Sequence, residues 1–240
     1  MKSGEQIVNE VAAALERETR VNLHGLPLQL GFADGVLTMD GEVEHIMAKK
    51  MALEVAAATP GVGAIVDRLH LVPATRMEDG ELRDHVCTSL RAEKLLDSLA
   101  LRTVVKGKQE VVREPYGAVG TIDVETNNGI VILNGTVPSL SAKRLAGVLA
   151  WWVPGSRDVV NGIEVSPPED DNDDEVVDAV RLVLEKNPFV NAAQIRIGCS
   201  NYTVTLDGLV KSAAQRQMAE ADAWYVFRVD RVVNLLQVVA

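Results

Sequence analysis

Three stretches of the chain alternate apolar and polar residues around a shared glycine. They read VLTMDGEV with Gly41, VILNGTV with Gly135 and VTLDGLV with Gly208. Alternation with a period of two, carried by β-branched residues, is typical of a strand buried on one face. Thirteen and eleven residues before each glycine comes an apolar pair that predicts an earlier strand, namely Leu28 and Leu30, Ile122 and Val124, and Ile195 and Ile197.

The residues between these two predicted strands favour a tight turn. Asp34-Gly35 and Asn128-Gly129 stand at the same distance before the glycine, and the third copy has Asn201-Tyr202. Pairs of this kind accept the positive φ angles that a two-residue turn requires. Each copy therefore predicts a β-hairpin.

Apolar residues at helical spacing predict one helix before each hairpin and another after it. The helices before the hairpins carry Ile7, Val11 and Leu15, then Leu82, Val86 and Leu90, then Val176, Val180 and Leu184. The helices after them carry Met51, Ala52 and Val55, then Leu145, Ala146 and Leu149, then Met218 and Ala219, with Asp222 breaking the pattern. A last strand is predicted to end 26 residues after each glycine, at Asp67, Asn161 and Asn234.

These recurrences predict an α+β protein of three tandem small α-β-β-α-β domains, each with two helices packed on a three-stranded mixed sheet. We place the domains at residues 1–74, 77–167 and 173–240, with an insertion at about 95–120 in the second. The linkers at 73–80 and 166–175 are short and polar. We interpret the acidic run from Glu169 to Glu175 as a solvated linker that also feeds acidic residues into the positive N-terminus of the next helix.

The three copies resemble the BON domain, a family named for bacterial osmotic-shock and nodulation proteins. The residues that carry the resemblance are the glycine-centred strands, the helix of small residues after each, and the closing segments PGVGAIVDRLHL, PGSRDVVNGIEV and FRVDRVVNLLQV. The resemblance covers nearly all of the chain and implies a small fold of two helices against a three-stranded sheet. It also implies a bacterial stress-response context and binding without catalysis, with attachment to phospholipid, small ligands, ions or other proteins. The family has no universal catalytic motif, so no site residue is carried over from it.

Charge and hydropathy narrow the class of partner. The net charge of −10 and the pI near 4.9 argue against nucleic-acid binding, which needs a basic face to neutralise phosphates. No stretch reaches the roughly 18 to 20 apolar residues that cross a bilayer, so we predict no transmembrane segment. The first twenty residues carry charge throughout and suggest an amphipathic helix in place of a signal peptide, which predicts a cytoplasmic protein.

Residues that could catalyse a reaction or hold a metal ion are scattered along the sequence. Cys87 and Cys199 lie 112 residues apart, which is typical of two reduced, mostly buried thiols. The acidic run lacks the mid-loop glycine and late glutamate of a calcium loop. The four histidines show no spacing typical of a zinc site: His24, His45, His70 and His85. We therefore expect no enzyme, no cofactor and no metal site.

The insertion in the second domain concentrates positive charge. Arg102, Lys106, Lys108 and Arg113 fall within twelve positions, in a domain that is almost neutral between two acidic neighbours. Local charge, and not net charge, determines contact with an anionic head group or phosphate. These four residues are one candidate surface, and a solvated hairpin or loop is the alternative.

The aromatic residues suggest a second candidate surface. Trp151 and Trp152 lie sixteen and seventeen residues after their glycine, and Trp224 and Tyr225 occupy the same places in the third copy. At about 100° per residue, Trp152 and Tyr225 are predicted to cap their own cores, and Trp151 and Trp224 to face outward. The outward pair could join domains two and three, contact a partner or a second copy, or bind lipid or a small ligand.

The resulting hypothesis is a non-enzymatic binding protein that associates with membrane phospholipid. The alternative is a cytosolic protein–protein adaptor, or a module that senses a small ligand or ion without touching lipid. The sequence leaves open whether the chain forms homo-oligomers.

Overall fold

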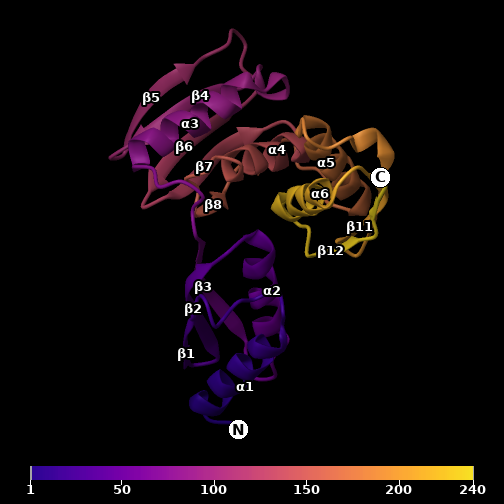
Figure 1. Cartoon of the computed structure of the whole chain (residues 1–240). Helices are drawn as coiled ribbons and strands as arrows, with labels where there is room; N and C mark the ends of the chain where they lie inside the picture. The colour runs from indigo at the N-terminus through magenta and orange to yellow at the C-terminus, as the bar shows by residue number, and fades with distance from the viewer. Residues whose placement is uncertain (1, 240) are drawn as a thin grey trace. The chain divides into compact units, whose positions relative to one another are not determined.

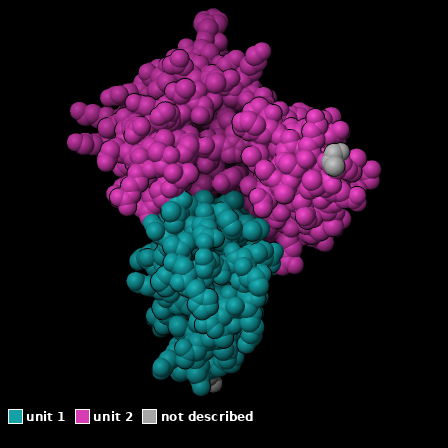
Figure 2. Space-filling view, in the orientation of Figure 1, with its two compact units in different colours: residues 1–72 teal, residues 73–240 magenta. Residues whose placement is uncertain are grey.

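Each repeat folds into the predicted order of helix, strand, strand, helix and strand in the computed structural model, which describes residues 2–239 (Figure 1). The α+β class and the three tandem domains are confirmed. The chain separates into two compact units, residues 1–72 and 73–240 (Figure 2). Unit 1 holds the first repeat, and unit 2 holds the second and third. The finer domain boundaries predicted from the sequence remain predictions.

Unit 1 is a three-stranded sheet with two helices. Its elements are α1 (Gly4–Arg17), β1 (Gln29–Ala33), β2 (Val36–Val43), α2 (Ile46–Ala57) and β3 (Ala64–Leu71). The central strand β2 pairs antiparallel with β1 and parallel with β3. Ile7, Val11 and Leu15 are buried on α1, and Met51 and Ala52 on α2, as their spacing predicts.

The second repeat has the same plan with a larger sheet. Its elements are α3 (Asp79–Ala92), η1 (Lys94–Leu96), β4 (Ala100–Val105), β5 (Lys108–Arg113), β6 (Thr121–Asn127), β7 (Ile130–Val137), α4 (Leu140–Trp151), β8 (Asp158–Asn161) and β9 (Glu164–Val165). The strand order is β5-β4-β6-β7-β8, with β9 also paired to β7. The insertion is therefore the β4–β5 hairpin, whose first strand runs parallel to β6 along the sheet edge.

The third repeat returns to the shorter plan. Its elements are α5 (Asp173–Lys186), η2 (Ala192–Gln194), β10 (Ile195–Ser200), β11 (Thr203–Val210), α6 (Ala213–Tyr225), β12 (Arg231–Asn234) and β13 (Gln237–Val238). The sheet order is β10-β11-β12, with β13 also paired to β11. Ala219 is buried as predicted, whereas Met218 is 39% exposed and Asp222 is buried. The break in the apolar pattern at Asp222 thus marks a buried carboxyl group.

The shared glycine is explained by its backbone and by the neighbouring strand. Gly208 has φ +138°, and a Cβ atom there would clash with the carbonyl oxygen of Gln194 on the adjacent segment. Gly135 has φ +119° and faces the carbonyl oxygen of Thr121 in the same way. Only glycine combines this positive φ with so close an approach of two strands.

The Asp or Asn that follows each glycine by 26 residues ties the closing strand to the second helix. Asn161 donates from Nδ2 to the carbonyl of Lys143 on α4. Asn234 donates to the carbonyl of Arg216 on α6. In the first repeat Asp67 forms an ion pair of 3.1 Å with the buried Lys49 of α2 instead. Strands β8 and β12 end at Asn161 and Asn234 as predicted, but β3 continues past Asp67 to Leu71.

The second and third repeats pack together within unit 2. Its four helices contact one another, α3 with α4, α4 with α5, and both α4 and α5 with α6. The second and third repeats therefore share a packed helical junction. Among residues 2–239 no helix combines the length and the apolar character required to cross a membrane.

Candidate functional site

The four basic candidates all lie on or beside the β4–β5 hairpin. Lys106 and Gly107 form its two-residue turn, with φ angles of 51° and 76°, between the paired residues Val105 and Lys108. Lys106, Gly107 and Lys108 are exposed. The tip therefore presents two lysines on a well-defined backbone.

The two arginines of the hairpin are used within the protein. Arg113 donates to the carbonyl of Leu99 and forms an ion pair of 3.3 Å with Asp97. Arg102 lies 3.4 Å from Glu114. The basic cluster predicted from the sequence thus divides into two structural arginines and two exposed lysines.

Apolar side chains stand exposed close to these lysines in the chain. Val111 on β5 is 64% exposed, and Tyr116 and Val119 are also exposed in the segment that leads to β6. Glu110 is exposed on the same strand and offsets part of the lysine charge. We define the tip surface as Lys106 and Lys108.

The aromatic candidates meet at the junction between the second and third repeats. The rings of Trp151 on α4 and Tyr225 on α6 stack with centroids 5.8 Å apart and an interplanar angle of 30°. Aromatic pairs in this range contribute about 0.5–1.5 kcal/mol beyond the area they bury. Trp152 donates from Nε1 to Oδ1 of Asp222 across the same boundary, at 3.2 Å.

Three of the four predicted aromatic orientations are wrong. Trp224 is 1% exposed, although it was expected to face outward. Tyr225 and Trp152 reach the other repeat, although they were expected to cap their own cores. The helical-wheel prediction assumed one buried face for each helix, whereas α6 packs against its own sheet and also against α4 and α5. The first repeat carries the exposed Ala57 and Ala58 at the corresponding places.

Asp222 is a buried carboxyl group with two donors. Asn187, at the end of α5, donates to its Oδ2 at 2.7 Å, and Trp152 donates to its Oδ1. Burial raises the pKa of Asp222 to about 6, against the lowering effect of these two hydrogen bonds. Burial, and secondarily the charge of Asp222, also raises the pKa of Tyr225.

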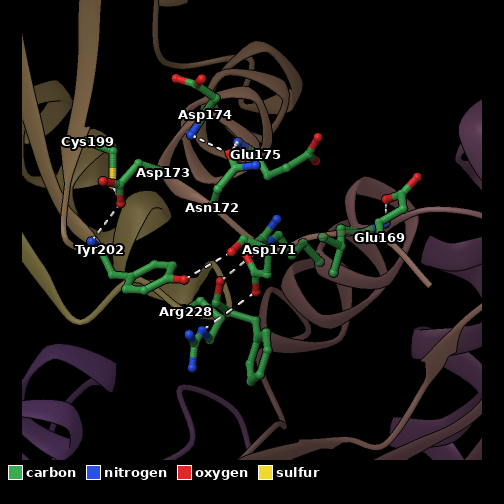
Figure 3. A network of polar contacts seen from close by, with 12 residues as sticks. Glu169, Asp171, Asn172, Asp173, Asp174, Glu175, Cys199, Tyr202 and Arg228 are labelled. Atoms are coloured by element: carbon green, nitrogen blue, oxygen red, sulfur yellow. Dashed lines mark hydrogen bonds and ion pairs between the residues drawn. The ribbon is translucent and has the colours of Figure 1, made fainter.

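The acidic linker is part of the junction. Asp171 accepts from Nη2 of Arg144 at 2.5 Å and lies 3.6 Å from Nε of Arg228 (Figure 3). The Arg144 side chain is completely buried on α4, and its Nε donates to the carbonyl of Phe227 at 3.3 Å. The guanidinium of Arg144 thus holds the linker and the end of α6 together. The solvated-linker interpretation is wrong for Asp171.

The neighbouring acidic residues order the start of the third repeat, as Figure 3 shows. Asn172 caps α5 by accepting from the backbone N–H groups of Asp174 and Glu175. Asp173 accepts from the backbone N–H groups of Asn201 and Tyr202 in the β10–β11 turn. Tyr202, at φ +57°, donates from its hydroxyl to the carbonyl of Asp171 beneath the Arg228 guanidinium. The predicted delivery of acidic residues to this helix is therefore observed.

Both cysteine thiols have a raised pKa. Burial, followed by the nearby charge of Asp84, raises the pKa of Cys87 to about 11. Burial and a hydrogen bond to Asp173 raise the pKa of Cys199 to about 12. Both thiols are free and protonated at neutral pH. Among residues 2–239 no group of three or more His, Cys, Asp or Glu is arranged to hold a metal ion.

The sequence analysis missed the polar residues of the junction. Arg144 stands at a helical position that is polar in all three copies, Asp171 sits within an acidic run, and only Asp222 left a signal, as a charge in an apolar pattern. The eight predicted candidates form two clusters on different elements, the hairpin β4–β5 and the helices α4 and α6.

Asp222 is expected to make the stability of unit 2 depend on pH. Because its folded pKa of about 6 exceeds the ordinary 3.8, the native state holds a proton that the unfolded chain releases between these values. Its contribution to the free energy of unfolding is therefore greatest below about pH 4, falls as the pH rises to about 6, and is then constant, for a total on the order of 2–3 kcal/mol.

The comparison of the native protein with Asp222→Asn isolates this effect. Glu93 and Asp173 have lowered pKa values and change stability in the opposite direction in both proteins. Urea unfolding at pH 5 and pH 8 should show the native protein gaining stability relative to D222N at the lower pH. A difference between the two proteins that does not change with pH would contradict the raised pKa.

The sequence was compared with family profiles and with curated proteins. The profile of the BON domain matches residues 3–73, 106–167 and 172–240. The curated "Osmotically-inducible protein Y" of Escherichia coli strain K12 is 26% identical over 129 residues, which span 54% of this chain and 57% of that protein. The chain therefore covers little more than half of the curated relative that it matches.

The comparison with solved structures found weak similarity to CdsD, a structural protein of the type III secretion system of Chlamydia trachomatis. One structure is 14% identical, with 98% of this chain and 92% of that chain covered. A second, of the C-terminal domain, is 13% identical, with complete coverage of both chains. The TM-score is 0.25 in each case, which carries no argument about arrangement or function.

Proposed function

This chain belongs to the BON domain family, and on that basis we propose that it is a non-enzymatic, stress-related binding protein that associates with anionic phospholipid through its second domain. The stress-related context is inferred from the osmotically inducible relative. The observation that carries the lipid proposal is the tip surface, where Lys106 and Lys108 stand exposed at the turn of the β4–β5 hairpin.

The chemistry of the tip surface suits a lipid–water interface. Each lysine or arginine near an anionic membrane surface contributes about 1 kcal/mol, and this contribution is screened by salt. The aliphatic stems of the two lysine side chains add apolar area that can enter the head-group region.

Charge reversal at the tip is expected to remove lipid binding. The native protein should float with vesicles that contain anionic phospholipid at low salt, and less of it should float as salt is added. Lys106→Glu with Lys108→Glu should lower the partition coefficient at least about tenfold, because two attractive charges become repulsive. Co-flotation is the measurement.

A matched control separates the tip from net charge. Lys94→Glu with Lys211→Glu makes the same change of charge at two other exposed lysines and should float almost as the native protein does. Equal losses in both double variants, or no flotation of the native protein, would exclude the tip surface as a lipid site. The second outcome would leave the adaptor or small-ligand function as the better hypothesis.

Location and assembly stay predictions. We propose a cytoplasmic protein, which fractionation of cells that express the full chain would test, and the formation of homo-oligomers is left open.

A further inference from the structure

The second repeat shows how this fold accepts an additional strand. In it, β4 runs parallel to β6, with Ala100 beside Thr121 and Thr103 beside Val124. The added strand begins with a hydrogen bond from the N–H of Ala100 to the carbonyl of Gly120, at 2.9 Å. In the third repeat the corresponding strand, β10, ends the sheet of described strands.

A pocket lies at the start of β10 in the third repeat. When Gly208 is aligned with Gly135, Ala193 and Gln194 correspond to Gly120 and Thr121, which face the start of β4. Ala193 and Gln194 line a pocket of about 310 Å³ together with Ile195, Arg196, Arg181, and Asp207 and Gly208 of the paired strand β11.

The charge at this edge is inverted between the two repeats. In the second repeat Asp123 accepts from Gln109 of the added hairpin at 3.1 Å. Arg196 stands at the same position in the third repeat, and Arg181 of α5 is exposed on the other side of the pocket. Arg196 pairs with Asp207 at 3.3 Å, but its side chain is 84% exposed, so this pair is weak and can be exchanged.

We propose that the edge of β10 binds an extended, acidic segment of a partner protein, which adds a strand parallel to β10 as β4 does to β6. The segment places a carboxylate opposite Arg196. Main-chain hydrogen bonds provide most of the affinity in strand addition, and the side chains provide the selectivity. This interaction goes beyond the proposed lipid function and uses a different domain.

The first repeat is a poorer acceptor of the same segment. Pro27 stands at the position of Gln194 and has no N–H to donate. Gln29 stands at the position of Arg196, so this edge lacks the cation. The proposal therefore applies to β10 and not to β1.

The test uses the full chain and two fluorescent peptides. One peptide has the sequence of residues 98–105, SLALRTVV, and the other carries Arg102→Glu in that sequence. The acidic peptide should bind at least about tenfold more tightly than the parent peptide in fluorescence polarisation, and hydrogen exchange should show new protection of the β10 amides.

Variants of the full chain localise the site. Arg196→Glu should abolish the preference for the acidic peptide, and Arg181→Glu, which leaves the sheet unchanged, should reduce it. Lys108→Glu should leave peptide binding unchanged while it weakens vesicle flotation. R196E should leave vesicle flotation unchanged. The lipid proposal and the strand-addition proposal can therefore be disproved independently of each other.

Three results would overturn the proposal. The first is that the acidic peptide does not bind at a concentration of about 1 mM, which corresponds to the weak limit of specific recognition. The second is that both peptides bind equally tightly. The third is that the amides of β1, and not those of β10, become protected.

Discussion

Replacing Arg144 by alanine is expected to lower the free energy of unfolding of unit 2 by about 3–5 kcal/mol. The side chain is completely buried, and its removal leaves Asp171 with only the distant Arg228 and leaves the carbonyl of Phe227 without this donor. The free energy of unfolding falls for two reasons. The half-buried carboxylate of Asp171 loses its short ion pair, and the missing side chain leaves a large cavity. Urea unfolding of the full chain, followed by tryptophan fluorescence, measures this loss.

Matched variants separate the charge of Arg144 from its volume. Arg144→Met keeps most of the volume and should cost less than alanine. Combining it with Asp171→Asn should recover further stability, because replacing both members of a buried pair is often close to neutral. Equal losses for R144A and for the double variant would show that the ion pair contributes nothing specific. Limited proteolysis at residues 166–172 should become faster in R144A, since Arg144 holds this linker.

Replacing Trp224 by alanine is expected to cost about 3–5 kcal/mol as well. Trp224 is among the largest completely buried side chains of the described chain, on the helix α6 that packs against α4 and α5. For a unit of this size the loss corresponds to a fall in Tm of roughly 6–20 °C, which differential scanning calorimetry would detect.

Two further substitutions, one at Trp224 and one at Trp151, serve as controls for W224A. Trp224→Phe keeps an aromatic ring and should cost clearly less. Trp151→Ala removes a half-buried ring that stacks on Tyr225, and its cost should also be smaller, since less area is buried. A loss in W224A no larger than that in W151A would contradict the buried position of Trp224.

The tryptophan residues illustrate how far sequence patterns reach. Trp151 and Trp224 stand sixteen residues after Gly135 and Gly208, and this shared offset correctly places both at the end of the second helix of their repeat. The direction that each ring faces could not be predicted, because a helical wheel describes one helix and one sheet. The ring of Trp224 is buried on a helix that contacts α4 and α5 as well as its own sheet, and Ala57 and Ala58 are exposed in the repeat that forms unit 1 alone.

The basic insertion shows the same limit at another site. Its composition identified four candidates, and its length indicated a hairpin or loop. Leu99 and Asp97 contact Arg113, and Glu114 contacts Arg102. The two lysines of the turn therefore remain as the exposed cations that a ligand could reach. Such pairings join residues 12 to 16 positions apart, a spacing that no local pattern encodes.

Taken alone, the sequence determined the repeat, the order of elements, the hairpin turns and most of the apolar residues buried within each domain. These features depend on local periodicity, on turn chemistry and on the glycine that allows two strands to approach. The tertiary structure alone decided that the second and third repeats share one junction, and that Arg144, Asp171 and Asp222 are its polar centre. It did so because burial and pairing depend on which surfaces meet in space, and charged residues on a helix or linker appear solvent-exposed until a second repeat covers them.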